Sequence, residues 1–143
     1  MLIVMPMTEL KLREVSHSDY RFLYELLKNR NQQANISHKT MPTFEEHVEF
    51  VMSKPYDTWY VIEYTNKKIG SIYLSKQDEI GISFVDDSFH DQFGNRVIKL
   101  LTKKNPRKRY LANVSPLNKK LQNFFVNNGF TELEYTYELI SDS

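Results

Sequence analysis

Hydrophobic residues along this chain follow two spacings. Alternation at every second position is typical of a strand with one buried face, and recurrence at every third and fourth position is typical of a helix. The alternating pattern predicts strands at residues 10–15 and 132–139, and short apolar runs between polar turns predict further strands at 59–64, 69–74, 80–85 and 110–114. The helical pattern predicts one helix that opens after residue 16 and further helices at 43–52, 95–104 and 115–128. The predicted order is strand, two helices, three strands, helix, strand, helix, strand.

Local signals mark several of the predicted helix ends. Thr43 is followed three residues later by Glu46, which is the pattern of a capping box. Ser115 and Pro116 are typical of the first positions of a helix, and Gly129 is typical of the position just after one. These signals indicate where the second and the last helix begin and where the last helix ends.

The order of elements predicts the fold class. Strand 80–85, helix 95–104 and strand 110–114 form a βαβ unit, whose two strands should be parallel with a right-handed crossover. The preceding strands are joined by short polar turns, which is typical of antiparallel pairing. We therefore expect one α+β domain over residues 1–143, with a mixed, mostly antiparallel central sheet flanked by four helices.

The composition is that of an ordinary globular domain, with 41% hydrophobic and 26% charged residues. A formal net charge of +1 gives no electrostatic reason to expect nucleic acid or a membrane as a partner. Cysteine is absent, which excludes disulfides and thiol nucleophiles and is compatible with the reducing cytoplasm, where we expect the protein. The four histidines are scattered without a spacing of four residues, so we expect no metal site.

The stretch from Glu79 to Leu101 carries the candidate chemistry. It is expected to run from a strand through a polar turn, Asp86 to Asn95, into a helix. Backbone N–H groups and the helix dipole both favour an anion at such a helix start. The pattern alone is also that of an ordinary strand-to-helix connection, so from the residues both interpretations stay open.

This stretch resembles the acyl-CoA-binding core of the GNAT N-acetyltransferases, in which a strand is followed by Arg/Gln-x-x-Gly-x-Gly/Ala and a helix. Phe89 stands at the Arg/Gln position, Gln92 at the first glycine and Gly94 at the second. The resemblance implies acetyl-CoA as co-substrate and the GNAT fold. The residues that it implies for cofactor binding in this stretch are Phe84, Val85, Phe89, Gln92, Phe93, Gly94, Asn95 and Arg96.

A second segment, 118–130, is similar to the family's Asn-x-x-(Ser/Ala)-x-x-Leu-Tyr-x-x-x-Gly-Phe. The resemblance implies that Asn118 lies beside the pantetheine arm. Phe125 stands where many members have a tyrosine that protonates the departing thiolate. Phenylalanine cannot donate a proton, so the acid would be water or another residue, or the thiolate would leave unassisted.

The N-terminal half resembles the bacterial amino-sugar N-acetyltransferases, through Arg30-Asn31 and through Phe44-Glu-Glu-His47 with Phe50. The resemblance implies a small-molecule amine as acceptor, which could be a nucleotide-linked amino sugar contacted by Arg30 and Asn31. A homodimer is left open.

Direct transfer of an acetyl group needs a neutral amine, and therefore a base or a pocket that lowers the amine's pKa. The candidate bases are Glu79, which matches a glutamate opening the family's core strand, and His47, whose imidazole titrates near neutrality. Glu79 could equally be a solvated residue at a strand start, and His47 a helix residue bordering the core. A backbone N–H at Phe84 or Val85 is expected to polarise the thioester carbonyl.

Two functions stay open from the sequence. One is an acetyl-CoA-dependent N-acetyltransferase. The other is a GNAT-fold module that binds a ligand or partner without catalysis, which the side chains of Phe89, Gln92, Asp91 and Phe125 favour.

Overall fold

The computed structural model describes residues 9–34 and 40–141, with the side chains of 31–34 excepted. Within these residues the strands are β1 (Leu10–Glu14), β2 (Thr58–Tyr64), β3 (Lys67–Leu74) and β4 (Ile80–Phe84). They form one sheet in the order β1-β2-β3-β4, and every neighbouring pair is antiparallel. The predicted meander of three consecutive strands is confirmed.

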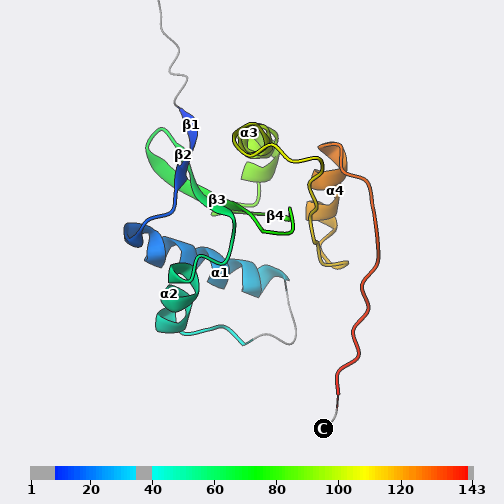
Figure 1. Ribbon diagram of the computed structural model, residues 1–143, viewed down its shortest axis with the longest axis horizontal. Coiled ribbons are helices and arrows are strands. Elements are labelled where there is room, and N and C mark those ends of the chain that lie inside the picture. Colours follow the sequence, from blue (N-terminus) through cyan, green and yellow to red (C-terminus); the bar gives the residue numbers. More distant parts are fainter. Residues whose placement is uncertain (1–8, 35–39, 142–143) are drawn as a thin grey trace, which may run out of the picture.

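The helices lie on both sides of this sheet. They are α1 (Tyr20–Ala34), α2 (Phe44–Met52), α3 (Phe89–Lys104) and α4 (Lys119–Asn127), and a short 3-10 turn, His17–Asp19, leads into α1. Helices α1 and α2 cover one face, α3 covers the other, and α4 stands beyond β4 (Figure 1). This is the α+β arrangement of a central sheet and four helices that the sequence predicts.

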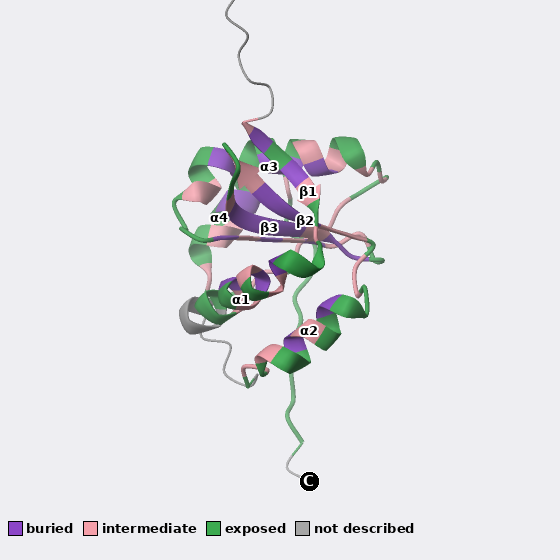
Figure 2. Ribbon diagram, turned by 90° about the vertical axis from the view of Figure 1, so that its left-hand side faces the viewer, coloured by how far each residue is buried: buried purple, intermediate pink, exposed green. Residues whose placement is uncertain are grey.

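The main core lies between the sheet and α3. Ile80, Ile82 and Phe84 are buried on one face of β4, and α3 presents a buried stripe that includes Val97 and Leu101. Buried residues concentrate in the strands and on the helix faces turned toward them (Figure 2). No helix among residues 9–34 and 40–141 is long and apolar enough to cross a bilayer.

Local boundaries follow the chemistry of single residues. The capping box of α2 is confirmed, because Thr43 Oγ1 accepts from Glu46 N at 3.1 Å and Glu46 Oε1 accepts from Thr43 N at 2.8 Å. The β2–β3 turn holds Thr65 and Asn66 at φ values of 46° and 68°, which suits the right-handed twist of a hairpin.

Two predicted helix starts are wrong. Helix α3 begins at Phe89 and not at Asn95, because Phe89 and Phe93 extend its apolar stripe by one more turn. Helix α4 begins at Lys119 and not at Ser115, because Asn118 Oδ1 accepts from Leu121 N at 3.0 Å and caps the helix there.

Two predicted strands do not form within the described residues. The first, 110–114, makes a single parallel bridge, Glu79 to Leu111, and then diverges from β4. The second, 132–139, is extended but belongs to no sheet, and every residue from Thr131 to Ser141 is exposed. Both segments have sequences typical of strands, but a strand also needs a partner over its length.

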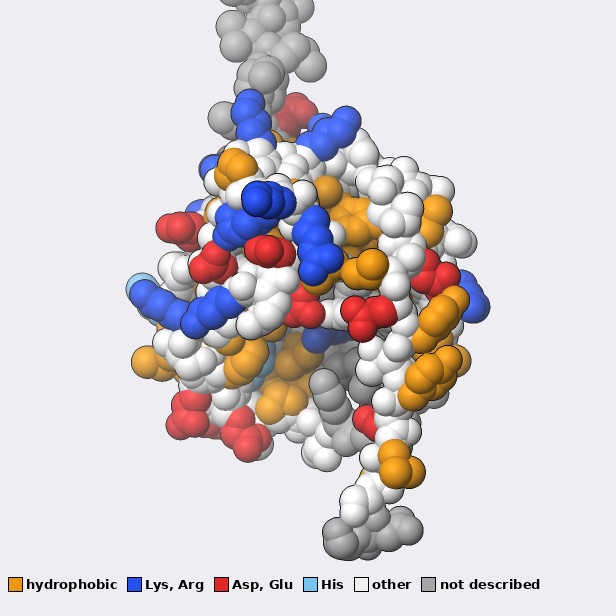
Figure 3. Space-filling view, turned by 45° about the vertical axis from the view of Figure 1, so that its right-hand side comes forward, with side chains coloured by type: hydrophobic (Ala, Val, Ile, Leu, Met, Phe, Trp, Pro, Cys, Tyr) orange, Lys and Arg blue, Asp and Glu red, His pale blue; other side chains and the backbone are white. Residues whose placement is uncertain are grey.

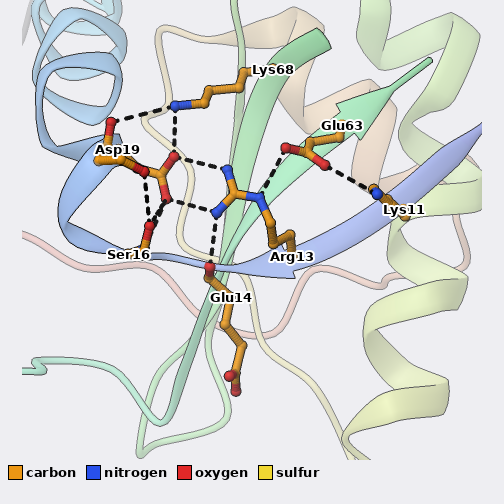
Figure 4. Close-up of polar contacts among 8 residues, drawn as sticks. Lys11, Arg13, Glu14, Ser16, Asp19, Glu63 and Lys68 are labelled. Carbon is orange, nitrogen blue, oxygen red and sulfur yellow. Dashed lines mark hydrogen bonds and ion pairs between the residues drawn. The ribbon is translucent and has the colours of Figure 1, made fainter. Parts of the chain in front are cut away.

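An ion-pair network centred on the buried carboxylate of Asp19 joins β1 to the start of α1 (Figure 4). The side chain of Asp19 is 0% exposed and accepts from both terminal nitrogens of Arg13, at 2.9 and 2.8 Å. Lys68 Nζ lies 2.7 Å from Asp19 Oδ1, and the backbone N–H of Ser16 donates to Oδ2 at 2.8 Å. On its other side Arg13 Nε donates to Glu63 at 2.9 Å. The network therefore fixes β1, the 3-10 turn and the β2–β3 hairpin to one another.

Removing the central charge of this network should strongly destabilise the fold. We expect Asp19→Asn to lower the free energy of unfolding by about 3–5 kcal/mol, because Arg13 and Lys68 would lose their buried counter-charge. Urea unfolding measures the change. The matched control is Glu25→Gln, which removes an exposed pair with Arg21 and should cost less than about 0.5 kcal/mol. Similar losses in the two variants would contradict this account.

The same network predicts a pH dependence. Burial alone would raise the pKa of Asp19, but hydrogen bonds from Arg13 and Lys68 outweigh it and hold this pKa well below its ordinary value of 3.8. The unfolded chain binds the proton first as pH falls, so the stabilisation is complete above about pH 5 and is lost progressively below it. We expect the stability of Asp19→Asn to change less between pH 5 and 3 than that of the unmodified chain. If the stability of both proteins changed equally with pH over this range, Asp19 would not be the source of the pH dependence.

Candidate active site

The site is built on the edge of β4 that faces away from β3. At the start of β4, Ile80 N donates to Leu111 O at 2.7 Å and Leu111 N donates to Asp78 O at 2.8 Å. Beyond this point segment 111–114 leaves the strand. Strand β4 and segment 111–114 therefore diverge like the arms of a V, with the base of the V at Glu79 and Leu111.

Antiparallel pairing determines which backbone groups of β4 face the opening. Val85 N donates to Ile69 O at 2.9 Å, and Ser75 N donates to Glu79 O at 2.8 Å, so the odd-numbered residues bond to β3. Because bonding alternates along an antiparallel pair, the backbone N–H groups of Ile82 and Phe84 face the other edge. Of the two amides considered from the sequence, Phe84 faces the opening and Val85 does not.

The opening is a cleft of about 760 Å³. Its walls come from β4, from residues 113–115, and from the first turns of α3 and α4. Carboxylates of Asp87 and Asp91 lie on the α3 side, whereas Lys119 and Lys120 lie on the α4 side. The cleft therefore carries charge of both signs, negative on the α3 side and positive on the α4 side.

A second cavity of about 370 Å³ adjoins this cleft on the face covered by α1 and α2. The two share the side chains of Leu26, Arg30 and Tyr73 and the β4 residues Gly81 and Ser83. A Cβ at position 81 would overlap the Tyr73 ring, so glycine lets this ring lie directly over β4 at the junction. The rest of the second cavity is largely aromatic, with Phe50, Tyr56, Trp59 and His47 among its lining residues.

His47 lies in this aromatic cavity, on α2. The residue is 5% exposed, its ring packs between Tyr24 and Phe50, and its buried Nδ1 has no hydrogen-bond partner among the described residues. Burial, and then the positive charge of Arg30, lower the pKa of His47 below 6.5. The imidazole is therefore neutral at pH 7 and able to accept a proton.

Glu79 lies elsewhere, at the base of the V. Its Oε1 accepts from Ser75 Oγ at 3.1 Å and its Oε2 accepts from Asn113 Nδ2 at 2.7 Å. The carboxylate thus links the end of β3 to the diverging segment. The structure places the two candidate bases in different cavities, His47 with the aromatic side chains and Glu79 in the cleft.

The β4–α3 turn does not offer the free amides expected of an anion site. Asp86 Oδ1 accepts from Ser88 N at 2.9 Å, and Asp86 O accepts from Phe89 N at 3.0 Å. The next three amides of the turn donate to the carbonyls of Asp87 and Ser88. The turn closes on itself, and its first-turn amides already have acceptors.

The residues expected to bind the cofactor therefore divide into two groups. Those that line the cleft are Phe84, Val85, Asn118 and Phe125. Those that line neither cavity are Phe89, Gln92, Phe93, Gly94, Asn95 and Arg96. The second group lies within α3, where Phe93 is buried in the core, Arg96 lies over the Phe93 ring and Asn95 bonds to Asn128.

Gly94 has a packing role that the sequence did not indicate. It lies inside α3, and a Cβ there would overlap the ring of Phe124 on α4. Glycine therefore allows α4 to pack closely against α3 beside the cleft.

Four residues of the site were not identified from the sequence, which placed His90 within the polar turn from Asp86 to Asn95. His90 is half-buried on α3 between Phe84 and Phe124, and burial lowers its pKa. Lys119, Lys120 and Tyr73 also line the cleft. Only the early start of α3, signalled by Phe89 and Phe93 four residues apart, could have located His90. Of the expected substrate residues, Arg30 lines both cavities, and the side chain of Asn31 lies outside the described part.

No known family model matches the chain, and no curated protein matches its sequence significantly. Solved structures do match its fold. A domain from Methanocaldococcus jannaschii superposes with a TM-score of 0.76 at 21% identity, covering 90% of this chain and 92% of that domain. A spermidine N-acetyltransferase from Vibrio cholerae in complex with CoA and spermine gives 0.73 at 21% identity, over 89% of this chain and 83% of that one. An acetyltransferase from Thermus thermophilus gives 0.68 at 17% identity, over 87% and 88%.

This chain has the GNAT fold. The similarity extends over about nine-tenths of the chain. At these identities the likeness establishes the GNAT fold and leaves the chemistry to be argued from the residues of this chain.

The packing role of Gly94 can be separated from a ligand-binding role. We expect Gly94→Ala to destabilise the protein by about 1–3 kcal/mol through overlap with Phe124, although alanine is the better helix former. Thermal unfolding of this variant, of Phe124→Leu and of the double variant measures the coupling. The double variant should recover part of the loss, because the smaller side chain makes room. Strictly additive losses would contradict direct packing.

Proposed function

We propose that the protein transfers an acyl group from acetyl-CoA to the primary amine of a small molecule. The observation that carries this proposal is the V at the edge of β4, where the amides of Ile82 and Phe84 face a long cleft. A pantetheine arm laid along this edge could accept hydrogen bonds from them as an added strand would. The structural neighbour crystallised with CoA and spermine supports the same use of the fold.

The aromatic cavity is the proposed acceptor site. It adjoins the cleft at Tyr73 and Gly81, so an amine held there would approach the acyl carbon from the α1–α2 face of β4. Glu46 is the one acidic residue among the described residues that line this cavity, and its carboxylate already accepts a hydrogen bond from the backbone N–H of Thr43. A polycation such as spermine would therefore find little counter-charge. Aromatic rings and Arg30 suit a sugar ring bearing a phosphate, and thus a nucleotide-linked amino sugar.

The proposed roles of the residues follow from their protonation. His47, neutral at pH 7, would take a proton from the acceptor ammonium or from the attacking amine. The Phe84 amide would donate to the thioester oxygen as negative charge develops on it. Acetyl-CoA supplies the acyl group, and the CoA thiolate leaves. Phe125 has no proton to give that thiolate, so solvent in the open cleft would supply it.

A second function is favoured by a specific observation. Because the amides of the β4–α3 turn are hydrogen-bonded within the turn, and Asp87 and Asp91 line the cleft beside it, a diphosphate has little to bind there. A ligand-binding module without catalysis would have this property. Under the main proposal the diphosphate must instead contact Lys119 and Lys120 on the opposite wall.

Titration calorimetry with acetyl-CoA separates the two functions. We expect a dissociation constant tighter than about 100 μM, which corresponds to about 5.5 kcal/mol. Replacing Lys119 and Lys120 by Gln should weaken binding about tenfold or more, since charged hydrogen bonds contribute about 1.5–3 kcal/mol each. Lys103→Gln, on the exposed end of α3, is the control. No heat at millimolar acetyl-CoA would reject acyl transfer.

Thiol release in the presence of amino-sugar and polyamine acceptors tests the base. We expect His47→Gln to lower turnover about 100-fold or more while acetyl-CoA affinity stays unchanged. The rate of the unmodified enzyme should fall as pH decreases through a value below 6.5, because burial and Arg30 lower the His47 pKa. Glu79→Gln can still accept from Ser75 through Oε1 and can donate to Asn113 Oδ1 once the Asn113 amide turns over, so it should retain most activity. The opposite ranking of these two variants would assign the base to Glu79.

A further inference from the structure

Residues 92–109, which form most of α3 and the turn after it, carry a strong local charge. They contain seven basic and no acidic residues, although the formal net charge of the whole chain is only +1. The rest of the chain is therefore net acidic, and the net charge, from which we expected no nucleic-acid partner, averages out this separation. A basic stretch of this kind is the electrostatic footprint of a surface that binds a polyanion.

Three of the basic side chains form a row along α3. Arg96, Lys99 and Lys103 are exposed at intervals of three and four residues, which places them on one side of the helix. Val97 and Leu101, on the opposite side, are buried. Lys and Arg side chains gather on the upper half of the face shown in Figure 3, at the height of α3 in Figure 1. The row therefore lies on the surface of the molecule, directed away from the core.

The turn after α3 continues this surface from a fixed backbone. Arg107 forms ion pairs with Asp57 and Asp78, and its backbone N–H donates to Tyr110 Oη at 2.9 Å. These contacts anchor the turn and use the charge of Arg107. The other six basic residues of the stretch are exposed and are called the basic face: Arg96, Lys99, Lys103, Lys104, Lys108 and Arg109.

The charge of the basic face is not neutralised by the part of the chain that the structure describes. None of its six side chains forms an ion pair with a described residue, and the two aspartates nearest the turn are paired with Arg107. The helix dipole accounts for Lys103 and Lys104, which lie in the last turn of α3. It does not account for the other four, so the surface keeps an excess of positive charge.

The surrounding side chains decide which polyanion fits. No large hydrophobic residue between Val85 and Leu117 is exposed, and all residues in this interval are described. The basic face therefore has no apolar side chains to enter a bilayer and no exposed aromatic rings on which single-stranded bases could stack. Because α3 packs against the sheet through its other side, contacts are expected with phosphates and not with base edges.

We propose that the basic face binds the phosphate backbone of double-stranded nucleic acid without reading its sequence. The row from Arg96 to Lys103 spans about 10 Å at about 1.5 Å per residue, and a duplex carries one negative charge about every 1.7 Å of its axis. The row and the turn can therefore contact several phosphates together. This binding does not depend on the proposed acyl transfer, because no residue of the basic face lines either cavity.

Fluorescence anisotropy of labelled DNA and RNA duplexes of about 20 base pairs, titrated with the full chain, tests the proposal. At near-physiological salt we expect at least one of the two to bind with a dissociation constant of about 1–100 μM, similar for different sequences. The logarithm of its association constant should fall with that of salt concentration with a slope of about −3 or steeper, as for about four phosphate contacts. Failure of both duplexes to bind, or tighter binding of single strands, would overturn the proposal.

Charge reversal assigns the binding to this surface. Lys99→Glu combined with Lys103→Glu should weaken duplex binding about 30-fold or more and make the salt slope shallower by about 2, while acetyl-CoA affinity stays unchanged. Lys28→Glu combined with Lys67→Glu changes the net charge equally at exposed residues elsewhere and should weaken binding less than about threefold.

Two results would remove the assignment. Equal losses in the two double variants would show that only net charge matters. Binding of the unmodified chain to vesicles of anionic phospholipid, lost in Lys99→Glu with Lys103→Glu and not matched by any duplex, would make the partner a membrane surface.

Discussion

Strand β4 is hydrogen-bonded along one edge to β3 but meets segment 110–114 at a single bridge on the other. This one-sided pairing is the constraint on which the rest of the site depends. A second full ladder would occupy the amides of Ile82 and Phe84, and the cleft would close. Because segment 110–114 diverges after Leu111, the N–H groups of Ile82 and Phe84 still point away from β3 but have no acceptor in that segment. This part of the sheet edge is therefore available to a ligand.

The remainder of the molecule holds this edge rigidly. The Asp19 network fixes the hairpin that carries β3 to β1 and the start of α1, so the strand that orders β4 is itself fixed. On the other side, Gly94 lets Phe124 lie against α3, which sets the position of α4 at the wall of the cleft. The two cavities then meet at Gly81, where the absence of a side chain leaves room for Tyr73.

Most elements could be predicted because their signals are local. The β2–β3 hairpin and the Thr43 capping box depend on neighbouring residues, and the structure confirms them. The errors occur where structure depends on distant partners. Residues 110–114 and 132–139 have strand patterns, but no neighbouring strand follows them within the described residues.

The site was predicted less completely for a related reason. Phe84, Asn118 and Phe125 were located through the family resemblance, and they line the cleft because β4 and α4 both form, although α4 begins at Lys119. The anion-binding turn predicted between β4 and α3 does not form as expected. Residues predicted to lie in a loop continue the apolar stripe of α3 and become its first turn. Whether His47, Glu79 or the lysines of α4 carry chemistry depends on burial and hydrogen bonding across the molecule, which spacing does not encode.

The exposed amides of β4 are the central claim, and ¹⁵N NMR during a titration with CoA observes them individually. We expect the largest shift changes at the amides of Ile82 and Phe84, with small changes at Val85, whose N–H is bonded to Ile69. Slower hydrogen exchange at the same two amides in the complex would accompany them. Shifts confined to the amides from Phe89 to Gln92, with Ile82 and Phe84 unchanged at saturation, would contradict the account.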